Sequence, residues 1–167
     1  MAICLDTSIV IPWIDETASI PPDPRTGSII PRARERIEAH IESLRSVRQT
    51  IIIPMPALAE VLSATTNSAW LVTLNDLSGL DLRPFGLREA EELARLNRRF
   101  GMKVTDRSRQ AVKVDRQIVA TALAASADQL YTMDDGMRRI AEQAGLTVLH
   151  VSDLPEAPAT QQGLFSD

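Results

Sequence analysis

The 167-residue sequence holds one cysteine, Cys4, and few aromatic residues: two Trp, one Tyr and three Phe. A single cysteine excludes an internal disulfide framework and is typical of proteins from a reducing compartment. Trp13 and Trp70 are isolated in the sequence, so they do not form the interleaved aromatic platform on which single-stranded nucleic acid stacks. No apolar run approaches the roughly 18 residues of a membrane helix, and the first residues lack the basic start of a signal peptide. We therefore expect a soluble, cytoplasmic protein with no membrane association.

Common motifs for nucleotide and zinc binding are also missing. The sequence contains neither G-x-x-x-x-G-K-[ST] nor G-x-G-x-x-G, which argues against binding of nucleoside triphosphates or dinucleotides. Neither histidine, His40 or His150, has a Cys or His partner at zinc-ligand spacing. Neither a nucleotide cofactor nor a zinc site is therefore expected.

Charge is distributed unevenly along the chain. The formal net charge is -4, and an acidic chain is not the usual form of a nucleic-acid binder. Residues 95–116, however, contain eight basic and two acidic residues, and five arginines lie between residues 32 and 48. Two interpretations stay open for each run: an ordinary solvated helix face, or a basic approach to a phosphate backbone.

Apolar runs alternate with amphipathic segments, a pattern that predicts alternating strands and helices. We expect strands at residues 2–5, 50–54, 80–85, 129–132 and 146–151, and helices at residues 8–14, 31–47, 55–66, 68–77, 88–100, 115–126 and 134–144. Thr7 or Ser8 would cap the first of these helices, and Pro31 would lie in the first turn of the second. Such an alternation is typical of an α/β fold with right-handed crossovers around a parallel sheet.

The length of the chain suits one domain, which we place at residues 1–152. Four prolines within residues 15–31 disfavour regular structure, so this stretch is predicted to be a surface loop inserted in the domain. Residues 153–167 show weak periodicity and are expected to form a loose tail.

Acidic residues occur where two predicted strands end. Asp6 directly follows the first strand, and Asp134 follows the strand at residues 129–132 with one residue between them. Because ligands of open parallel sheets bind at the carboxyl ends of the strands, both acids are expected at the binding edge. Asp115 would lie in the opening turn of the helix that precedes the strand at residues 129–132. Glu60 lies beside Leu58, Val61 and Leu62, which we expect to form the apolar face of the helix at residues 55–66.

Four converging carboxylates repel each other and need cations between them. Mg2+ and Mn2+ prefer oxygen ligands, and a pair of such ions would promote hydrolysis of a phosphodiester bond. Each acid also has a structural interpretation: Asp6 as a helix N-cap, Asp115 and Asp134 as favourable charges at helix N-termini, and Glu60 as an exposed rim residue. The sequence alone leaves both interpretations open for each residue.

Four segments resemble the PIN-domain nucleases, most closely the VapC-type toxin ribonucleases of bacterial toxin–antitoxin systems. The segments are LDTS (residues 5–8), PALAEVL (residues 56–62), DRQIVATALA (residues 115–124) and LYTMD (residues 130–134). They occur in the family's order and span about residues 2–151. The resemblance implies that Asp6, Glu60, Asp115 and Asp134 form the metal site.

The resemblance further implies a three-layer α/β/α fold with four or five parallel strands, and RNA cleavage that depends on one or two Mg2+ or Mn2+ ions. Thr7 and Ser8 match family positions that orient the first Asp or contact substrate. Arg116 is a further candidate for this role, and Asp135 is a candidate auxiliary acid. The implied partners are the RNA substrate and a small antitoxin protein, and a homodimer is also expected.

Three features depart from the family pattern. The loop at residues 15–31 and the helix after it lengthen the chain, Asp134 is followed by Asp-Gly-Met instead of the pattern D-x-D-F, and AVKV precedes Asp115 where a glycine is common. Two other functions stay open: a non-catalytic PIN-like module that binds RNA or protein, and a haloacid-dehalogenase-like phosphatase. The phosphatase requires a second Asp two residues after the first, and Ser8 occupies that position.

Overall fold

A five-stranded parallel sheet forms the centre of the protein in the computed structural model, which describes residues 2–64, 74, 79–101 and 109–157. The strand order is β3-β2-β1-β4-β5. The strands are β1 (Ala2–Leu5), β2 (Thr50–Pro54), β3 (Leu80–Arg83), β4 (Gln129–Tyr131) and β5 (Thr147–Leu149). Cys4 of the central strand pairs with Ile52 on one side and Leu130 on the other. The predicted α/β fold with a parallel sheet is confirmed.

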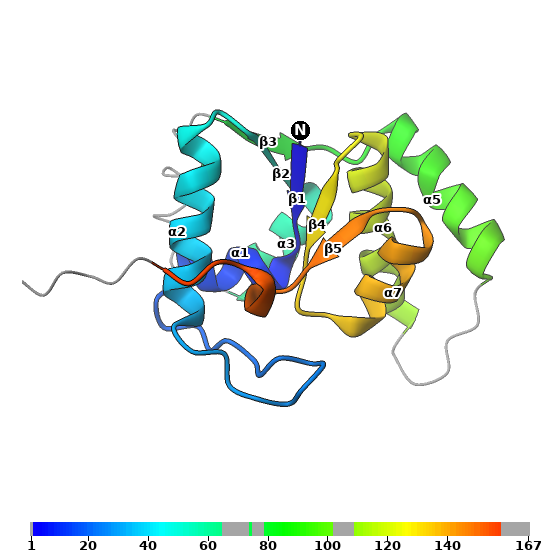
Figure 1. Cartoon of the computed structure of the whole chain (residues 1–167). Coiled ribbons are helices and arrows are strands. Elements are labelled where there is room, and N and C mark those ends of the chain that lie inside the picture. The colour runs from blue at the N-terminus through cyan, green and yellow to red at the C-terminus, as the bar shows by residue number, and fades with distance from the viewer. Residues whose placement is uncertain (1, 65–73, 75–78, 102–108, 158–167) are drawn as a thin grey trace, which may run out of the picture.

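Helices cover both faces of this sheet and create the three layers (Figure 1). The helices are α1 (Thr7–Ile14), α2 (Ala33–Ser46), α3 (Met55–Ala64), α5 (Leu87–Phe100), α6 (Arg109–Ala124) and α7 (Asp135–Gln143), followed by a 3-10 turn at Val151–Asp153. One apolar core joins the sheet to α1 and α2, and a second joins it to α5, α6 and α7. The helix α3 contacts both α1 and α6 and so lies between the two groups.

The central strand is buried on both faces, as expected for a parallel sheet between two helical layers. Ile3 and Leu5 belong to the core on the α1–α2 side, whereas Cys4 points into the core around α6. Cys4 is fully buried and behaves as a small apolar side chain in this position. Side chains of alternating direction along β1 therefore join the two cores through one strand.

Three details of the helices differ from the prediction. The second helix begins at Ala33, after Arg32 takes a left-handed conformation (φ 52°), so Pro31 precedes it instead of lying in its first turn. The helix that contains Asp115 is already present at Arg109, so this acid lies well inside α6 and not in an opening turn. Leu62 is 45% exposed, because α3 is buried only through the narrow stripe of Ala57, Leu58 and Val61.

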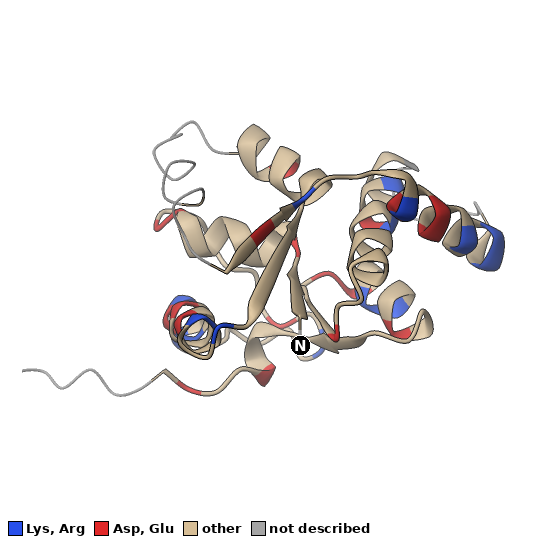
Figure 2. Ribbon diagram, turned by 90° about the horizontal axis from the view of Figure 1, so that it is seen from above, with Lys and Arg blue, Asp and Glu red and all other residues tan. Residues whose placement is uncertain are grey.

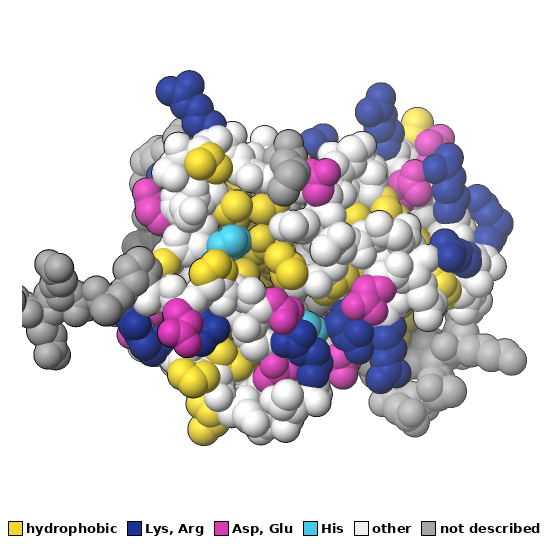
Figure 3. Space-filling view, viewed as in Figure 1, with side chains coloured by type: hydrophobic (Ala, Val, Ile, Leu, Met, Phe, Trp, Pro, Cys, Tyr) yellow, Lys and Arg dark blue, Asp and Glu magenta, His cyan; other side chains and the backbone are white. Residues whose placement is uncertain are grey.

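Basic residues of α2 are largely engaged with the protein itself. Figure 2 shows acidic residues interspersed with the basic ones along α2 and α5. In α2, Arg45 forms an ion pair with Glu42, and the Arg34 guanidinium binds backbone carbonyl oxygens at the end of α1. Figure 3 likewise shows basic and acidic side chains lying against one another on the face that it displays. The arginines between residues 32 and 48 thus fit the interpretation as an ordinary protein surface.

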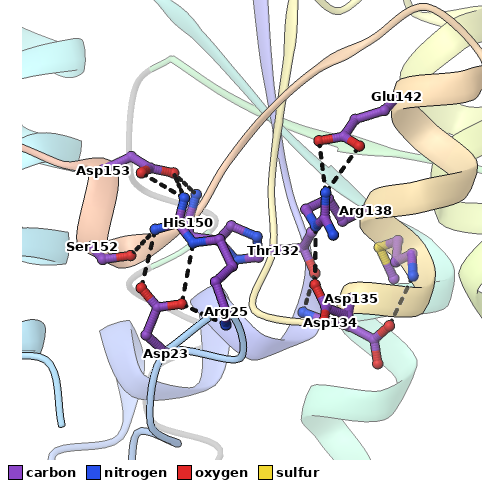
Figure 4. Close-up of polar contacts among 11 residues, drawn as sticks. Asp23, Arg25, Thr132, Asp134, Asp135, Arg138, Glu142, His150, Ser152 and Asp153 are labelled. Atoms are coloured by element: carbon purple, nitrogen blue, oxygen red, sulfur yellow. Dashed lines mark hydrogen bonds and ion pairs between the residues drawn. The ribbon is translucent and has the colours of Figure 1, made fainter. Parts of the chain in front are cut away.

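The stretch at residues 15–31, which the sequence predicts to be a surface loop, has no regular secondary structure. It is tied to the end of the domain through Arg25, whose guanidinium binds Asp23 at 3.0 Å and Asp153 at 2.9 Å (Figure 4). Leu154 is buried in the core, and the Ala157 carbonyl oxygen accepts a hydrogen bond from Arg32. The segment expected to be loose from residue 153 is therefore packed up to residue 157, and residues 158–167 lie outside the described part.

Apart from Leu74, the predicted helix at residues 68–77 lies outside the described residues. So does part of the basic run at residues 95–116, including Lys103 and Arg107. Among the helices that the structure does describe, none combines the length and apolar character needed to cross a membrane.

Candidate active site

Asp6 lies at the carboxyl end of β1 and caps the N-terminus of α1. Its Oδ1 accepts the backbone N–H of Thr7 at 2.6 Å, and its Oδ2 accepts the Ser8 hydroxyl at 2.7 Å. Asp6, and not Thr7 or Ser8 as predicted, is therefore the N-cap. This choice follows from the early start of α1, whose first residue is already Thr7. The structural interpretation of Asp6 as a cap is thus correct. A helix N-cap can also bind a ligand, so this role does not exclude the predicted role as a metal ligand.

Burial shapes the electrostatics of the Asp6 carboxylate, which is only 3% exposed. Desolvation raises the pKa of Asp6, while the hydrogen bonds from Ser8, Thr132 and the backbone of Thr7 act in the opposite direction. Within the described part of the chain, no basic side chain forms an ion pair with it. A desolvated carboxylate with neutral donors only is a group whose charged form a cation would stabilise.

Thr7 connects Asp6 to the helix α3. Its hydroxyl donates a hydrogen bond to Glu60 Oε2 at 2.6 Å, although the two residues are 53 positions apart in the sequence. Glu60 itself is exposed, in agreement with its interpretation as a rim residue. The contact between α1 and α3 therefore brings a second carboxylate to the edge of the sheet where Asp6 lies.

Thr132 connects Asp6 to Asp134. The Thr132 hydroxyl donates to Asp6 Oδ2 at 2.8 Å and accepts the backbone N–H of Asp134 at 3.0 Å. Asp134 is the N-cap of α7, since its Oδ1 accepts the backbone N–H of Met137 at 2.8 Å. The helix-terminus interpretation of Asp134 is therefore correct, and the same residue is also joined to Asp6 through one shared side chain.

Asp115 is a buried residue of the helix α6. Asp115 is 7% exposed on α6, a helix that contacts α3, β2 and β4. Its neighbour Arg116 is also buried, and the Arg116 guanidinium donates to Asn97 Oδ1 of α5 at 2.8 Å. Arg116, which the sequence predicts to bind substrate, therefore contacts the neighbouring helix α5.

Asp135, the possible auxiliary acid, lies in the first turn of α7 and forms an ion pair with Arg138 at 2.9 Å. Arg138 also binds Glu142 one turn further along the helix, as Figure 4 shows. Asp135 therefore already has a basic partner in the structure.

The acids at this edge of the sheet have the donor chemistry that a Mg2+ or Mn2+ ion requires. Asp6, Glu60 and Asp134 offer oxygen ligands only, which is the chemistry that these ions prefer, and the buried carboxylate of Asp6 lacks a basic partner among the described residues. Within the described ranges, however, no three Asp, Glu, His or Cys side chains already stand together as a metal-ligand group. The donor chemistry fits a hard cation, and the assignment of the four acids as its ligands stays a prediction.

Thr132 was not among the candidate residues predicted from the sequence, yet it contacts two of them. The sequence offered a signal, because this threonine is the first residue of the T-x-D segment at the end of a strand. Its side chain orients two of the predicted acids at once. Ser8 has a comparable place, since its hydroxyl donates to Asp6 and accepts the backbone N–H of Met133 at 2.9 Å.

Comparison with known proteins adds evidence on the fold. No protein-family model matches the sequence, and neither does any curated protein. Among solved structures, a chain of VapBC2 from Rickettsia felis bound to a DNA fragment from their promoter superposes with a TM-score of 0.54 and 19% identity, over 90% of this chain and 98% of that one. FitAcB from Neisseria gonorrhoeae gives 0.53 and 20% identity, over 91% of this chain and 99% of that one. FitAB bound to an IR36 DNA fragment gives 0.50 and 18% identity, over 92% and 98% of the two chains.

These matches extend over nearly the whole length of both chains. At such low identity they establish a shared fold. The three-layer architecture implied by the resemblance to VapC-type proteins is therefore confirmed at the level of the fold.

Proposed function

We propose that this protein is a metal-dependent endoribonuclease that hydrolyses RNA phosphodiester bonds, and that it is the toxin of a toxin–antitoxin pair. The observation that carries the proposal is the hydrogen-bonded arrangement of Asp6, Glu60 and Asp134 at one edge of the sheet. The resemblance of the surrounding segments to PIN-domain nucleases and the fold match to VapBC2 support it.

In this proposal Asp6, Glu60, Asp115 and Asp134 hold one or two Mg2+ or Mn2+ ions. The bound metal would supply a Lewis acid that favours deprotonation of a water molecule and stabilises the leaving oxygen. Ser8, Thr7 and Thr132 orient the acids, because their hydroxyl groups donate to Asp6 and Glu60. Each hydrogen bond occupies one lone pair of a carboxylate oxygen and orients the carboxylate, so the remaining lone pairs are available to a ligand.

The proposal includes partners of this chain. The resemblance to VapC-type toxins and the fold match to a VapBC2 structure support a small antitoxin protein as the partner of this chain. RNA is the proposed substrate. The homodimer and the cytoplasmic location expected from the sequence stay predictions.

A non-catalytic PIN-like module is the second candidate. The observation in its favour is that Asp6 and Asp134 both cap helices, a role that would explain two of the acids without a metal. Against it stands the buried Asp6 carboxylate, since an N-cap at a protein surface does not need to be desolvated.

A nuclease assay separates the two candidates. The purified chain is incubated with a mixed pool of single-stranded RNA in Mn2+, in Mg2+ and in EDTA, beside Asp6→Asn and the control Glu91→Gln, which changes an exposed acid on α5. We expect cleavage by the wild type and the control with either metal, and none in EDTA or by Asp6→Asn. Intact RNA under all conditions would refute the nuclease.

Metal binding is measured separately by calorimetry with Mn2+. Asp115→Asn should weaken the affinity at least tenfold if Asp115 is a ligand, because ligand loss costs more than loss of an orienting partner. Unchanged affinity in this variant would remove Asp115 from the site. The Glu91→Gln variant again provides the matched control.

A further inference from the structure

A groove of about 570 Å3 lies between α3 and α6, and Glu60 is part of its lining. The α3 wall consists mainly of small side chains, Ala59, Ser63 and Ala64. Small residues one turn apart leave a shallow wall without side chains that would project into the groove. The volume is in the range of sites that hold small organic groups.

The opposite wall carries two glutamines of α6. Gln110 and Gln117 are seven residues apart, so they lie on the same face of the helix, with Val114 between them. Their side-chain amides form no hydrogen bond with any residue that the structure describes. Each amide offers donors and an acceptor to whatever enters the groove.

The charge of the groove limits its occupant. Of the described residues that line it, Glu60 alone is charged, and none is basic. A phosphate group would therefore find no positive partner in this wall and would be repelled by Glu60. Apolar walls together with neutral amides suit a nucleobase, which has two apolar faces and an edge of donors and acceptors.

Glu60 also connects the groove to the acids of the candidate active site. The same carboxylate that lines the groove accepts the Thr7 hydroxyl at 2.6 Å, and Thr7 directly follows Asp6. A base in the groove would thus belong to a nucleotide that adjoins the phosphate at the acids. Only an unpaired base can be turned into such a groove, which selects single-stranded RNA.

We propose that the groove between α3 and α6 binds the base beside the scissile phosphate, and that Gln110 and Gln117 read the edge of this base. The inference rests on the proposed nuclease function and names the element that determines its specificity. Glutamine amides can bind a base edge through two hydrogen bonds, and one such pair discriminates between bases by about tenfold or more.

The test uses a single-stranded RNA oligonucleotide with randomised central positions, cleaved in Mn2+ and sequenced to give the base frequencies around each cut. The variants are Gln110→Ala, Gln117→Ala and the double variant, and the control is Gln143→Ala, which removes an exposed glutamine from α7. Thermal unfolding of each variant verifies that the fold is retained. We expect the wild type and the control to share a base preference at one position beside the cut. In the double variant this preference should be about tenfold weaker.

The outcomes separate this inference from the function on which it rests. Cleavage without any base preference, or a preference that the double variant keeps, would overturn the inference and leave the nuclease intact; this result is also expected if a protein segment occupies the groove. No cleavage by the wild type in Mn2+ or Mg2+ would refute both.

Discussion

Thr132 and Asp6 are joined by a hydrogen bond of 2.8 Å between the threonine hydroxyl and Asp6 Oδ2. Both side chains are buried, and they directly follow the neighbouring strands β1 and β4. The same hydroxyl accepts the backbone N–H of Asp134, so a single oxygen atom contacts the Asp6 carboxylate and the backbone of a second candidate metal ligand. The threonine is therefore as much a part of the candidate site as the acids.

Replacement of this hydroxyl should destabilise the protein. Thr132→Val keeps the shape of the side chain but leaves the Asp134 N–H without its acceptor and removes a donor from the buried Asp6 carboxylate. We expect the free energy of unfolding to fall by about 1–3 kcal/mol in urea denaturation. Thr132→Ser retains the hydroxyl and should lose clearly less. A valine variant as stable as the wild type would show that the bond contributes nothing.

Glu60 should affect activity much more than stability. Glu60 is exposed, and in Glu60→Gln the Thr7 hydroxyl can still donate to the amide oxygen, so the free energy of unfolding should change by less than about 0.5 kcal/mol. Loss of the negative charge should lower the rate of RNA cleavage about 100-fold or more, because a neutral amide is a weaker ligand for a divalent cation. Glu91→Gln is the matched control in both measurements. Equal cleavage rates in the two variants would exclude Glu60 from the site.

The strands could be predicted from the sequence because their pattern is local. AICL is continuously apolar, and TIIIP is apolar and buried after its first residue, as expected for strands that are covered on both faces. The order β3-β2-β1-β4-β5 is not encoded in such runs, since it depends on how distant segments pack. Segments of similar apolar character can exchange places in a sheet without any change in their own pattern.

The predicted start of α6 at Asp115 was wrong, because the helix boundary depends on packing and not on local pattern alone. The residues before Asp115 include Val112 and Val114, and β-branched residues have a lower helix propensity than alanine. Val114 packs against the core around α6, and this tertiary contact outweighs the small local preference. Helix boundaries set by packing are thus beyond what local pattern can indicate.

Some residues of the candidate site could likewise be predicted from the sequence, and others could not. Asp6 and Asp134 could be placed at one edge because parallel strands end there together. The bridge through Thr132 depends on register: Leu5 pairs with Tyr131, and this pairing sets the next residues, Asp6 and Thr132, side by side. A shift of one residue would turn Thr132 to the other face of the sheet. Register follows from the complete packing of the sheet, so the sequence did not reveal the bridge.

Arg34 should be important for stability and not for activity. Its guanidinium donates to the carbonyl oxygens of Pro12, Asp15 and Ala18, where α1 ends and the loop begins. Arg34→Met keeps the apolar stem but leaves these acceptors without their donor, so the free energy of unfolding should fall by about 1–3 kcal/mol. The rate of RNA cleavage by the folded variant should stay unchanged. Arg48→Met, which alters an exposed arginine beyond the end of α2, is the control.

The ion pairs around Arg25 should make stability depend on pH in the acid range. Hydrogen bonds from Arg25, and next from Ser152, hold the pKa of Asp23 well below its usual range. A carboxyl group whose pKa is lowered by folding contributes stability above its unfolded pKa of about 4, and this contribution is lost as the pH falls through the lower folded pKa. Asp23→Asn should therefore destabilise the protein by about 1 kcal/mol near neutral pH, a value typical of partly exposed ion pairs.

The difference in unfolding free energy between the wild type and Asp23→Asn should then shrink steadily as the pH is lowered below about 4, because protonation removes from the wild type the charge that the variant never had. Urea denaturation at a series of pH values measures both chains under the same conditions. Glu91→Gln, which alters an exposed acid, should show a small and nearly constant difference. A difference for Asp23→Asn that is equally constant would mean that Asp23 acts through the hydrogen bonds of its loop, which an asparagine can also accept, and not through its charge beside Arg25.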